Sequence, residues 1–424
     1  MTVSRVPVSI FVVLAALSLV VSGCSSAAPA ASAADVDLTV ATFGEFGYGP
    51  LFAEYEQAHP NVHVKGRVTD FDTHHKGLAT QLATGRGAAD VVAIEEQYLP
   101  TYRQSLDKFV DLATYGAKDL QNQWAPWKWA QGVSGDHVLG LGTDMGSLAL
   151  CYRRDLIAAA GLPADRAALA KLMPTWQAYA DVAERFAKAT PDVKFADSAG
   201  TIYTAMLNQA PENYFSQVDD SFIADRNPNV RNAFYLAGGI GAKGETAGVT
   251  PYTQPWTVAI KQGSFATIAC PAWLLTQIRE AGGAENSGKW DVTTIPGASG
   301  NQGGSFLTVP KQGKHPKEAY ELARWLTAPE QQKKLFLSAG ILPSEPAVYK
   351  DPQVVAKTDP YFSDAPVGQL FAASADTLRP NYRGLRDADV RPEFGRALGR
   401  IEQQKQTVEV AWPDALQQAR GVLK

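Results

Sequence analysis

Strand-like and helix-like segments alternate through the first part of this chain, and that order is its strongest constraint on the fold. Strand segments have alternating or continuous apolar residues, and helix segments repeat their apolar residues at helical spacing. In order, the sequence predicts a strand at 36–43, a helix at 50–58, a strand at 62–68, a helix at 74–84 and a strand at 89–94. Strand, helix, strand, helix, strand is typical of an α/β domain with a largely parallel sheet.

The remaining sequence continues in the same style. It predicts strands at 148–152, 265–270 and 303–310, and helices at 154–160, from 175 onward, and at 272–281, 317–326 and 329–339. About 390 residues would follow an N-terminal leader, which is more than one hydrophobic core usually organises, so we expect two α/β domains. A repeat of fixed period and a heptad pattern are both missing from the sequence, which disfavours solenoids and coiled coils.

The N-terminus has the layout of an export signal. Arg5 precedes a run of about fifteen mostly apolar residues, which is short for a membrane span, and the run stops at Ser22-Gly23-Cys24. Val21-Ser22-Gly23-Cys24 resembles the bacterial lipobox, which predicts a signal peptide at 1–23 and a lipid-modified Cys24. Residues 24–35, rich in Ala and Ser, then form a flexible tether. The alternative is an ordinary secreted protein cut near Ala30.

Charge and cysteine content narrow the function further. The chain has 39 basic and 43 acidic side chains without long blocks of either sign, so nucleic acid is not an expected partner. Of three cysteines, Cys24 is reserved for lipid, and Cys151 and Cys270 remain for a disulfide in an oxidising compartment. Two separate buried thiols are the alternative.

Polar and aromatic residues gather in the loops next to the predicted strands, where ligands sit in open α/β sheets. Carboxylates, amides, backbone and aromatic rings together suit a neutral carbohydrate, because hydroxyls bond to the polar groups and a sugar face packs on a ring. The candidate ligand-binding residues are Glu45, Phe46, Glu95, Glu96, Asp144, Trp273, Asn301, Gln302, Gly303 and Tyr382.

Each candidate has a structural alternative. Trp273 suits core packing as well as a ligand, Asp144 can cap a turn, and a Gly-rich turn around Gly303 needs no ligand to explain it. The loop with Tyr382 also carries Arg383 and Arg386, and we expect that loop to be solvated surface. A separate run with Trp124, Trp127 and Trp129 fits either a sugar groove or domain packing.

Several blocks resemble the extracellular solute-binding proteins of ATP-driven (ABC) sugar importers, in the maltose-binding-like group. The resemblance covers essentially the whole mature chain. The blocks are Phe52 to Val64, Ala89 to Glu95, Gly140 to Asp144, Leu150 to Pro163, Pro174-Thr175-Trp176, and Ala323 to Gln332 followed by Gly340-Ile341-Leu342-Pro343-Ser344. The blocks at 140–144, 150–163 and 174–176 look close to the branch that binds cellobiose and related β-linked oligosaccharides. One departure concerns Gln302, where that branch commonly has a tryptophan.

The resemblance implies a two-lobed fold of the type II periplasmic-binding-protein class. Lobe 1 would comprise 36–143 and about 305–345, and lobe 2 would comprise 144–304 and about 346–424, with the ligand cleft between them. Crossing segments are expected near 142–148, near 303–308, and between 340 and 374. It further implies a lipid-anchored, extracytoplasmic monomer without cofactor, which closes on a di- or oligosaccharide and delivers it intact to permease subunits with a cytoplasmic ATPase.

Two rival functions were weighed. A tethered glycoside hydrolase needs two carboxyl groups about 5 to 10 Å apart across one bond, whereas Glu95 and Glu96 point to opposite sides if their strand continues. A metal-capture protein would use the histidines, but no set of ligands completes a site. These histidines are His59, His63, His74 and His75. The expectation is therefore a binding protein and not an enzyme.

Overall fold

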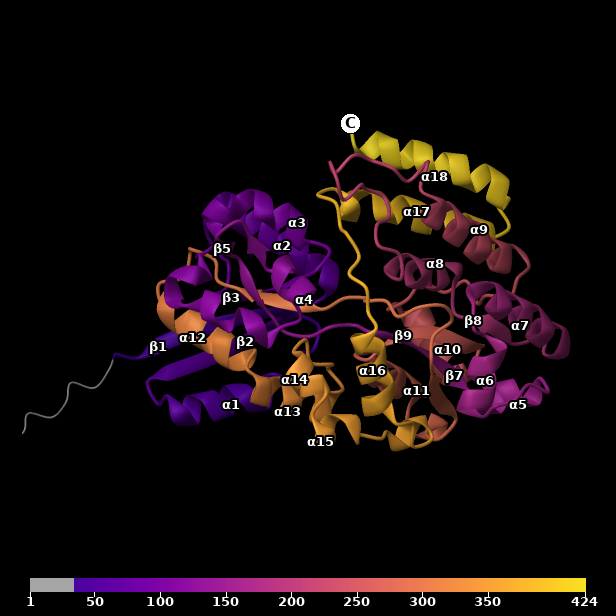
Figure 1. Ribbon diagram of the computed structural model, residues 1–424, viewed down its shortest axis with the longest axis horizontal. Helices are drawn as coiled ribbons and strands as arrows, with labels where there is room; N and C mark the ends of the chain where they lie inside the picture. Colours follow the sequence, from indigo (N-terminus) through magenta and orange to yellow (C-terminus); the bar gives the residue numbers. More distant parts are fainter. Residues whose placement is uncertain (1–33) are drawn as a thin grey trace, which may run out of the picture. The chain divides into compact units, whose positions relative to one another are not determined.

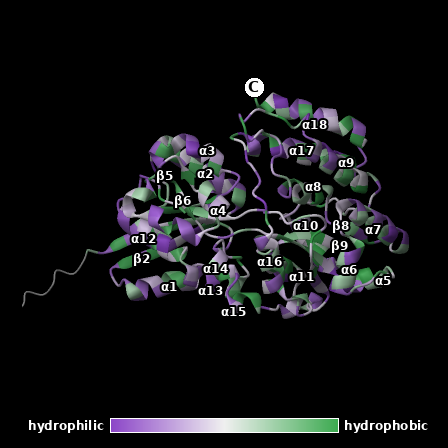
Figure 2. Ribbon diagram, in the orientation of Figure 1, coloured by the Kyte–Doolittle hydropathy of each residue, from purple (hydrophilic) through white to green (hydrophobic). Residues whose placement is uncertain are grey.

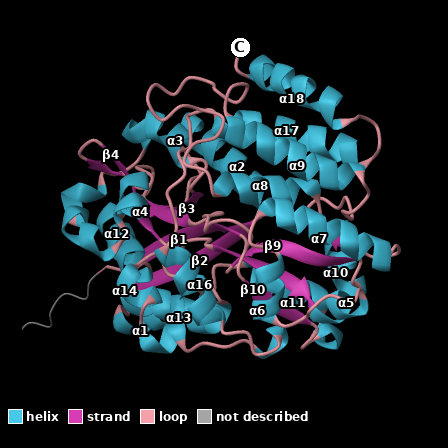
Figure 3. Cartoon of the chain, turned by 45° about the vertical axis from the view of Figure 1, so that its right-hand side comes forward, coloured by secondary structure: helices cyan, strands magenta, loops and turns pink. Residues whose placement is uncertain are grey.

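The computed structural model describes residues 34–424, and residues 36–424 form one compact unit (Figure 1). The signal segment, Cys24 and the tether up to residue 33 lie outside the described residues. Within the described part, no helix is both long and apolar enough to cross a membrane. Two larger sheets organise this unit, and helices flank both of them (Figure 3).

The first sheet has five strands in the order β2-β1-β3-β11-β6. Its strands are β1 (Val36–Phe43), β2 (Val62–Thr69), β3 (Val91–Glu95), β6 (Gly140–Gly142) and β11 (Ser305–Thr308). β1 pairs in parallel with both β2 and β3, as the sequence predicts, whereas β11 is antiparallel to β3 and β6. Strand β11, more than 200 residues later in the chain, therefore lies beside β3 and completes the sheet.

Both faces of the first sheet are covered at β3 and β11, whose residues are all buried, and this explains the continuous apolar run of β3. Successive strand residues point to opposite faces. Val91 and Ala93 pack in one hydrophobic cluster and Val92 and Ile94 in another. The α-helices that precede β7 are α1 (Gly49–Ala58), α2 (Phe71–Thr84), α3 (Leu99–Tyr102) and α4 (Pro126–Gln131), and the first two after β11 are α12 (Pro316–Leu326) and α13 (Pro329–Ala339).

The second sheet has four strands in the order β10-β7-β9-β8. They are β7 (Leu148–Arg153), β8 (Lys194–Ala196), β9 (Phe265–Pro271) and β10 (Trp290–Thr293). β7 is antiparallel to both β9 and β10, and only the β8 and β9 pair is parallel. The expectation that this region resembles the first is therefore wrong for strand direction. A small hairpin, β4 (Val133–Ser134) with β5 (His137–Val138), stands apart from both sheets.

Helices of the second half pack in two hydrophobic clusters on the faces of the second sheet. The helices between β7 and β10 are α5 (Arg154–Ala159), α6 (Arg166–Leu172), α7 (Trp176–Ala189), α8 (Ala199–Asn208), α9 (Pro228–Ala242), α10 (Gln254–Gln262) and α11 (Leu274–Gly282). The C-terminal helices are α14 (Pro346–Tyr349), α15 (Pro352–Val355), α16 (Val367–Asp376), α17 (Asp387–Glu402) and α18 (Val408–Val422). Figure 2 shows hydrophobic and hydrophilic residues alternating around helices such as α17 and α18, as expected for helices with one buried face.

The predicted disulfide is confirmed, since Cys151 of β7 is bonded to Cys270 of β9. The two strands are antiparallel neighbours, and the Cα atoms of the cysteines lie 5.7 Å apart. The bond closes a loop of 119 residues, so it strongly limits the freedom of the unfolded chain. It also fixes β9 three residues before Trp273.

Most predicted elements have shifted ends. Helix α2 begins at Phe71 rather than at residue 74, because the Asp70 side chain accepts a hydrogen bond from Thr73 N–H and caps the helix. Helix α11 begins at Leu274 instead of 272, and β11 covers 305–308 instead of 303–310. The two glycines before Ser305, Gly303 and Gly304, have φ values of 88° and 102°, which a regular strand does not allow.

Candidate functional site

Two chain segments run side by side between the two sheets. Residues 143–147 lead from β6 of the first sheet to β7 of the second, and residues 294–304 lead from β10 back to β11. Gln302 N–H donates to Gly146 O at 2.8 Å, and Gly146 N–H donates to the Asn301 side-chain oxygen at 2.9 Å. A Cβ on Gly146 would stand 1.8 Å from Gln302 O, so this close approach requires glycine.

Glu96 contacts residues from two distant parts of the chain, Asn301 in the crossing segment and Arg383 before α17. It follows β3 and is 5% exposed. Its Oε2 accepts hydrogen bonds from Asn301 Nδ2 at 2.7 Å and from Gln131 Nε2 at 3.1 Å, and its Oε1 lies 3.7 Å from an Arg383 nitrogen. Burial raises the pKa of Glu96, and the charges of Arg383 and Lys128 oppose that rise.

Glu95 ends β3 and is equally buried. Its backbone N–H donates to His75 Nε2 at 3.2 Å, and its Oε2 accepts from Gln97 N–H at 2.8 Å. Burial and the neighbouring Glu96 raise the pKa of Glu95 to about 8. The raised pKa favours the protonated form of Glu95, in which the carboxyl donates a hydrogen bond as well as accepting one.

Asp144 and Lys128 add a second pair of opposite charges. Asp144 Oδ1 accepts hydrogen bonds from Ser305 N–H at 2.9 Å and from the Thr143 hydroxyl at 2.5 Å. Lys128 is fully buried, its ammonium lies 4.1 Å from the centre of the Phe306 ring, and burial lowers its pKa against the pull of Asp144 and Glu96. Within residues 34–424, Lys128 Nζ has no hydrogen-bond partner.

Arg383 completes the group that we call the charged cluster: Glu95, Glu96, Lys128, Asp144 and Arg383. Arg383 donates to the Asn208 side-chain oxygen at 2.7 Å and lies 3.7 Å from both Glu96 and Asp387. Its Nε and Nη1 are buried without a hydrogen-bond partner in the described part of the chain. Donors buried without a partner cost free energy, so these two nitrogens would gain from a hydrogen-bond acceptor.

An aromatic wall borders the charged cluster and consists of Trp273, Tyr252 and Trp256. Trp273 is half-buried, and its indole N–H donates to Gln302 O at 3.0 Å, so the crossing segment sets the orientation of its ring. The Tyr252 ring lies 5.9 Å from Trp273 and 5.6 Å from Trp256. A Cβ on Gly303 would stand 3.3 Å from the Trp273 nitrogen and 3.9 Å from Glu95 Oε1, so Gly303 separates the wall from the cluster.

The structure brings seven of the predicted residues together through these contacts. They are Glu95, Glu96, Asp144, Trp273, Asn301, Gln302 and Gly303. Glu45 and Phe46 are not joined to them by any described contact: Glu45 is exposed, and Phe46 packs on Phe43 and Tyr48. Tyr382 lies beside the group, next to Arg383, with its hydroxyl donating to Asp220 at 3.0 Å.

Two residues of the cluster escaped the sequence analysis. The expectation that Arg383 is solvated surface is wrong, since it is 8% exposed and held by side chains from α8 and from the end of β3. Arg386 of the same loop is exposed, as expected. Lys128 was missed altogether, because lysine is rarely fully buried and nothing local in the sequence marks this one as an exception.

The tryptophans of that run mostly have structural roles. Trp124 is buried, its indole N–H donates to Gly142 O at 2.9 Å, and its ring stacks on Trp129 at 5.7 Å. Trp127 is half-buried and packs against a hydrophobic cluster of the second half of the chain. This arrangement favours domain packing over a sugar groove for Trp124.

The positions of Glu95, Glu96 and the histidines concern the two rival functions, a glycoside hydrolase and a metal-capture protein. Strand β3 ends at Glu95, so Glu95 and Glu96 do not alternate across a strand, and both join the charged cluster. His75 lies against this cluster with its Nδ1–H donating to Phe71 O and its Nε2 accepting from Glu95 N–H, and burial lowers the pKa of His75 to about 3. Among residues 34–424, no group of three or more His, Cys, Asp or Glu side chains is placed to hold a metal ion.

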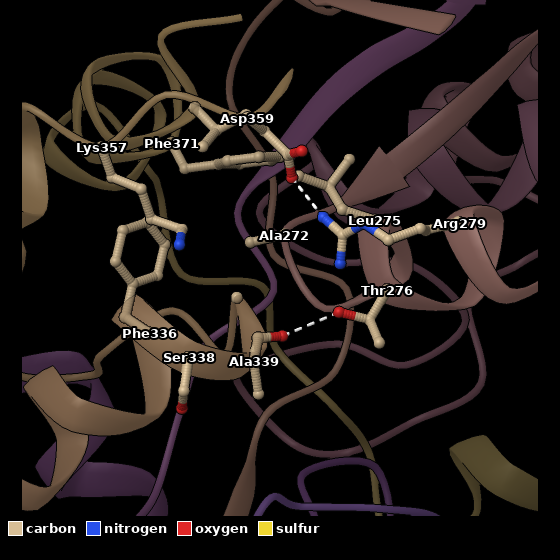
Figure 4. A pocket seen from close by; sticks show the side chains of 12 residues that line it. Ala272, Leu275, Thr276, Arg279, Phe336, Ser338, Ala339, Lys357, Asp359 and Phe371 are labelled. Atoms are coloured by element: carbon tan, nitrogen blue, oxygen red, sulfur yellow. Dashed lines mark hydrogen bonds and ion pairs between the residues drawn. The ribbon is translucent and has the colours of Figure 1, made fainter. Parts of the chain in front are cut away.

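A cavity elsewhere in the molecule is too small for a sugar (Figure 4). It has a volume of about 20 Å³, which is room for about one water molecule. Arg279 pairs with Asp359 on one side of it, and the Thr276 hydroxyl donates to Ala339 O at 2.8 Å on another. The cavity is therefore a small packing gap between α11, α13, α16 and the segment before α16.

The chain is similar to known proteins over most of its length. Residues 50–362 match the family model of the bacterial extracellular solute-binding proteins. An arabinooligosaccharide-binding protein of Bacillus subtilis is 23% identical over 89% of this chain and 90% of its own length. A solved extracellular solute-binding protein of family 1 is 42% identical, covers 92% of this chain and all of its own, and superposes with a TM-score of 0.83.

The binding protein of Bifidobacterium animalis subsp. lactis in complex with β-1,6-galactobiose has a TM-score of 0.78 at 18% identity, covering 91% of this chain and 98% of its own. At that identity the likeness concerns the fold, which is the two-domain, maltose-binding-like fold that the sequence predicts. The family model and the 42% identical structure go further and settle membership. The chain belongs to the bacterial extracellular solute-binding proteins, in the maltose-binding-like group, and is an extracytoplasmic binding protein and not an enzyme.

Proposed function

We propose that this protein captures a neutral di- or oligosaccharide between the charged cluster and the aromatic wall. The observation that carries the proposal is the position of the 301–302 segment. Asn301 bonds Glu96, which lies 3.7 Å from Arg383, and the neighbouring Gln302 carbonyl accepts a hydrogen bond from the Trp273 indole. An aromatic face with convergent carboxyl, amide and guanidinium groups is what a sugar requires, since its apolar face packs on the ring and its hydroxyls bond to the polar groups.

The charge balance of the cluster favours a neutral ligand. The cluster sets the acidic side chains Glu95, Glu96 and Asp144 beside the basic side chains Lys128 and Arg383. Charged groups of one sign are therefore already accompanied by the other, and burying an additional ion without its own counter-charge is costly. The similarity to an arabinooligosaccharide-binding protein and to a galactobiose complex supports a saccharide.

The division into lobes is part of the proposal. Residues 36–143 with about 305–345 would form lobe 1 around the first sheet, and residues 144–304 with about 346–424 would form lobe 2 around the second. The sheet composition supports this division, because every strand of each sheet falls in one lobe. Ligand would favour a closed arrangement of the lobes through the contacts that it makes with both.

The cellular context follows the family pattern. Cys24 would carry the lipid anchor after removal of residues 1–23, and residues 24–35 would tether the monomeric binding unit to the cell membrane. The permease subunits and cytoplasmic ATPase of an ABC importer would receive the sugar without any cofactor on this chain. We propose cellobiose-like sugars as the first ligands to screen. Gln302 stands where the cellobiose-like branch commonly has a tryptophan, so this chain has an amide in place of a ring that could stack on the sugar.

Calorimetric titration of the purified protein against a panel of oligosaccharides tests the proposal. We expect saturable binding of at least one neutral oligosaccharide, stabilisation of the fold by that ligand, and its recovery without cleavage. The panel should include a uronic-acid oligosaccharide of matched length as a charged control. Binding of the charged sugar alone, or steady release of reducing sugar, would contradict the proposal.

A further inference from the structure

Basic side chains gather on the first sheet at the end opposite the charged cluster. Asp90 directly precedes β3 and Glu95 ends it, so the two residues lie at opposite ends of this strand. Strand β11 runs antiparallel to β3, with Ser305 opposite Glu95 and Thr308 opposite Val92. The loop that follows β11 and leads to α12 therefore returns to the Asp90 end of the sheet.

Contacts among four segments build this end of the sheet around Asp90. Its Oδ2 accepts hydrogen bonds from the N–H of Thr39 at 2.8 Å and from the Thr39 hydroxyl at 2.7 Å. A Cβ on Gly313 would stand 2.8 Å from Asp90 Oδ1. The Gln312 side chain accepts a hydrogen bond from Ala88 N–H at 3.1 Å. The segments joined in this way are 35–41, 62–69, 85–90 and 309–315.

Five basic residues of these segments form what we call the basic patch. Lys65 of β2 lies opposite Thr39 of β1, and Arg67 donates a hydrogen bond to Gly87 O at 3.3 Å. The members of the patch are Lys65, Arg67, Arg86, Lys311 and Lys314. All five are exposed, and none of them forms an ion pair with another residue of 34–424. Their charges are therefore available to a partner outside the chain.

The basic patch is a local exception in an acidic protein. The same four segments contain three acidic residues, Asp35, Asp37 and Asp90, so the five basic residues outnumber them. Asp90 is already bonded by Thr39, and the whole chain has a formal net charge of −4. A positive patch suits an anionic partner, because opposite charges attract over about 10 Å at moderate salt. The five residues are spread over about 250 positions of the sequence, so the patch arises only on folding.

The proposed lipid anchor indicates which anionic partner is within reach. Strand β1 begins at Val36, three residues before Thr39, so the end of the proposed tether lies about 10 Å from Thr39 at about 3.3 Å per residue. Residues 24–35 can span at most about 40 Å, which keeps β1 within that distance of a membrane that holds Cys24. In Figure 1 and Figure 3, the start of β1 lies on the left of the molecule, the side on which α12 also lies. The surface of that membrane is therefore close to the patch.

We propose that the basic patch binds the anionic headgroups of the phospholipid surface to which Cys24 is anchored. The inference goes beyond sugar capture and rests on the proposed lipid anchor, to which it adds a second, electrostatic contact. Each Lys or Arg close to an anionic lipid surface strengthens binding by up to about five-fold. With the patch against the lipid, the charged cluster at the far end of β3 faces away from the membrane, toward the outside where sugar arrives.

The test is sedimentation of the mature chain with phospholipid vesicles, using Cys24→Ser to remove the acylation site. We expect binding to vesicles of phosphatidylcholine and phosphatidylglycerol in equal parts, loss of that binding at high salt, and none to phosphatidylcholine alone. Lys311→Gln with Lys314→Gln should lower the partition coefficient at least about five-fold. Lys171→Gln with Lys405→Gln removes the same charge from exposed lysines of α6 and of the loop after α17, and is the matched control with no change expected.

Calorimetric titration with the best oligosaccharide checks that each variant still folds and binds sugar as the wild type does. Equal binding to both kinds of vesicle, or equal losses for the two pairs of variants, would refute the basic patch. Binding to soluble polyphosphate but not to the mixed vesicles would refute the membrane contact and indicate an anionic polymer instead. If the wild-type protein binds no saccharide, or if mass spectrometry finds Cys24 unmodified in the native protein, the proposed function or its anchor fails, while vesicle sedimentation still decides on the patch.

Discussion

The charged cluster and the aromatic wall differ in how each is held in place. Residues of the charged cluster are buried, and their partners come from α4, α8, β11, α17 and the crossing segment 294–304. Residues of the aromatic wall lie in α10 and in the loops before α10 and α11, and two of the three rings are partly accessible. The cluster therefore couples distant parts of the chain, whereas the wall offers a surface for a ligand.

This difference predicts different responses to mutation. Removing a member of the cluster should affect stability, because it leaves a buried group unpaired. Removing a ring of the wall should affect affinity more than stability.

The disulfide supports the wall by fixing β9, which ends just before Trp273. Replacing Cys151 and Cys270 by serine together should lower the free energy of unfolding by about 4 kcal/mol, because the unfolded chain regains the freedom of a 119-residue loop. Urea denaturation of the variant beside the oxidised wild-type protein measures this. A loss below about 1 kcal/mol would show that the bond does not constrain the chain in this way.

Within the cluster, Arg383→Met should lower the free energy of unfolding by about 3 kcal/mol, since Glu96 and Asp387 lose a buried cation. Arg386→Met is the matched control in the same loop. Its side chain is 44% exposed, and its ion pair with Asp389 lies at the surface, so the expected loss is below about 1 kcal/mol. Equal losses for the two variants would argue against a distinct role for the cluster.

Within the wall, Trp273→Ala should weaken the best oligosaccharide at least about ten-fold, which corresponds to about 1.4 kcal/mol. Trp129→Ala removes another partly buried tryptophan away from the wall and serves as the control, with unchanged affinity expected. Calorimetry gives both dissociation constants. An unchanged constant for Trp273→Ala would remove this residue from the site.

The protonation of Glu95 adds a pH dependence to the cluster. Its pKa in the folded protein, about 8, lies above the ordinary value of 4.5, so the folded state binds the proton more tightly than the unfolded state. The resulting stabilisation is present at low pH and is lost as pH rises through about 8, with a slope of at most about 1.4 kcal/mol per pH unit. Glu95→Gln should flatten the stability profile between pH 6 and 8, measured by denaturation at each pH. A variant profile as steep as that of the wild type would exclude Glu95 as its source.

Sequence reasoning recovered the parts of the fold that local patterns determine. β1, β2 and β3 are parallel and separated by helices, as their alternation predicts, and the ligand loops after β3 and β9 follow from the strand ends. The antiparallel pairing of β7 with β9 was missed, because it joins segments more than 100 residues apart and leaves no local periodicity.

Residues that the structure brings together could be predicted where polar residues directly follow an apolar strand, as at Glu95 and Glu96. Arg383 was assigned to the surface because its loop is polar and rich in turn residues. Its burial depends on Asn208 at the end of α8 and on Glu96 after β3, which come together only in the folded chain. Burial of a charged residue is therefore a tertiary property that composition did not reveal.

A crystal structure of the protein with its tightest oligosaccharide tests the central claim most directly. The account predicts a sugar ring against the Trp273 face, with hydroxyls bonded to the Glu96, Asn301 and Arg383 side chains. A sugar bound elsewhere, with the charged cluster and the aromatic wall both free of ligand, would contradict it.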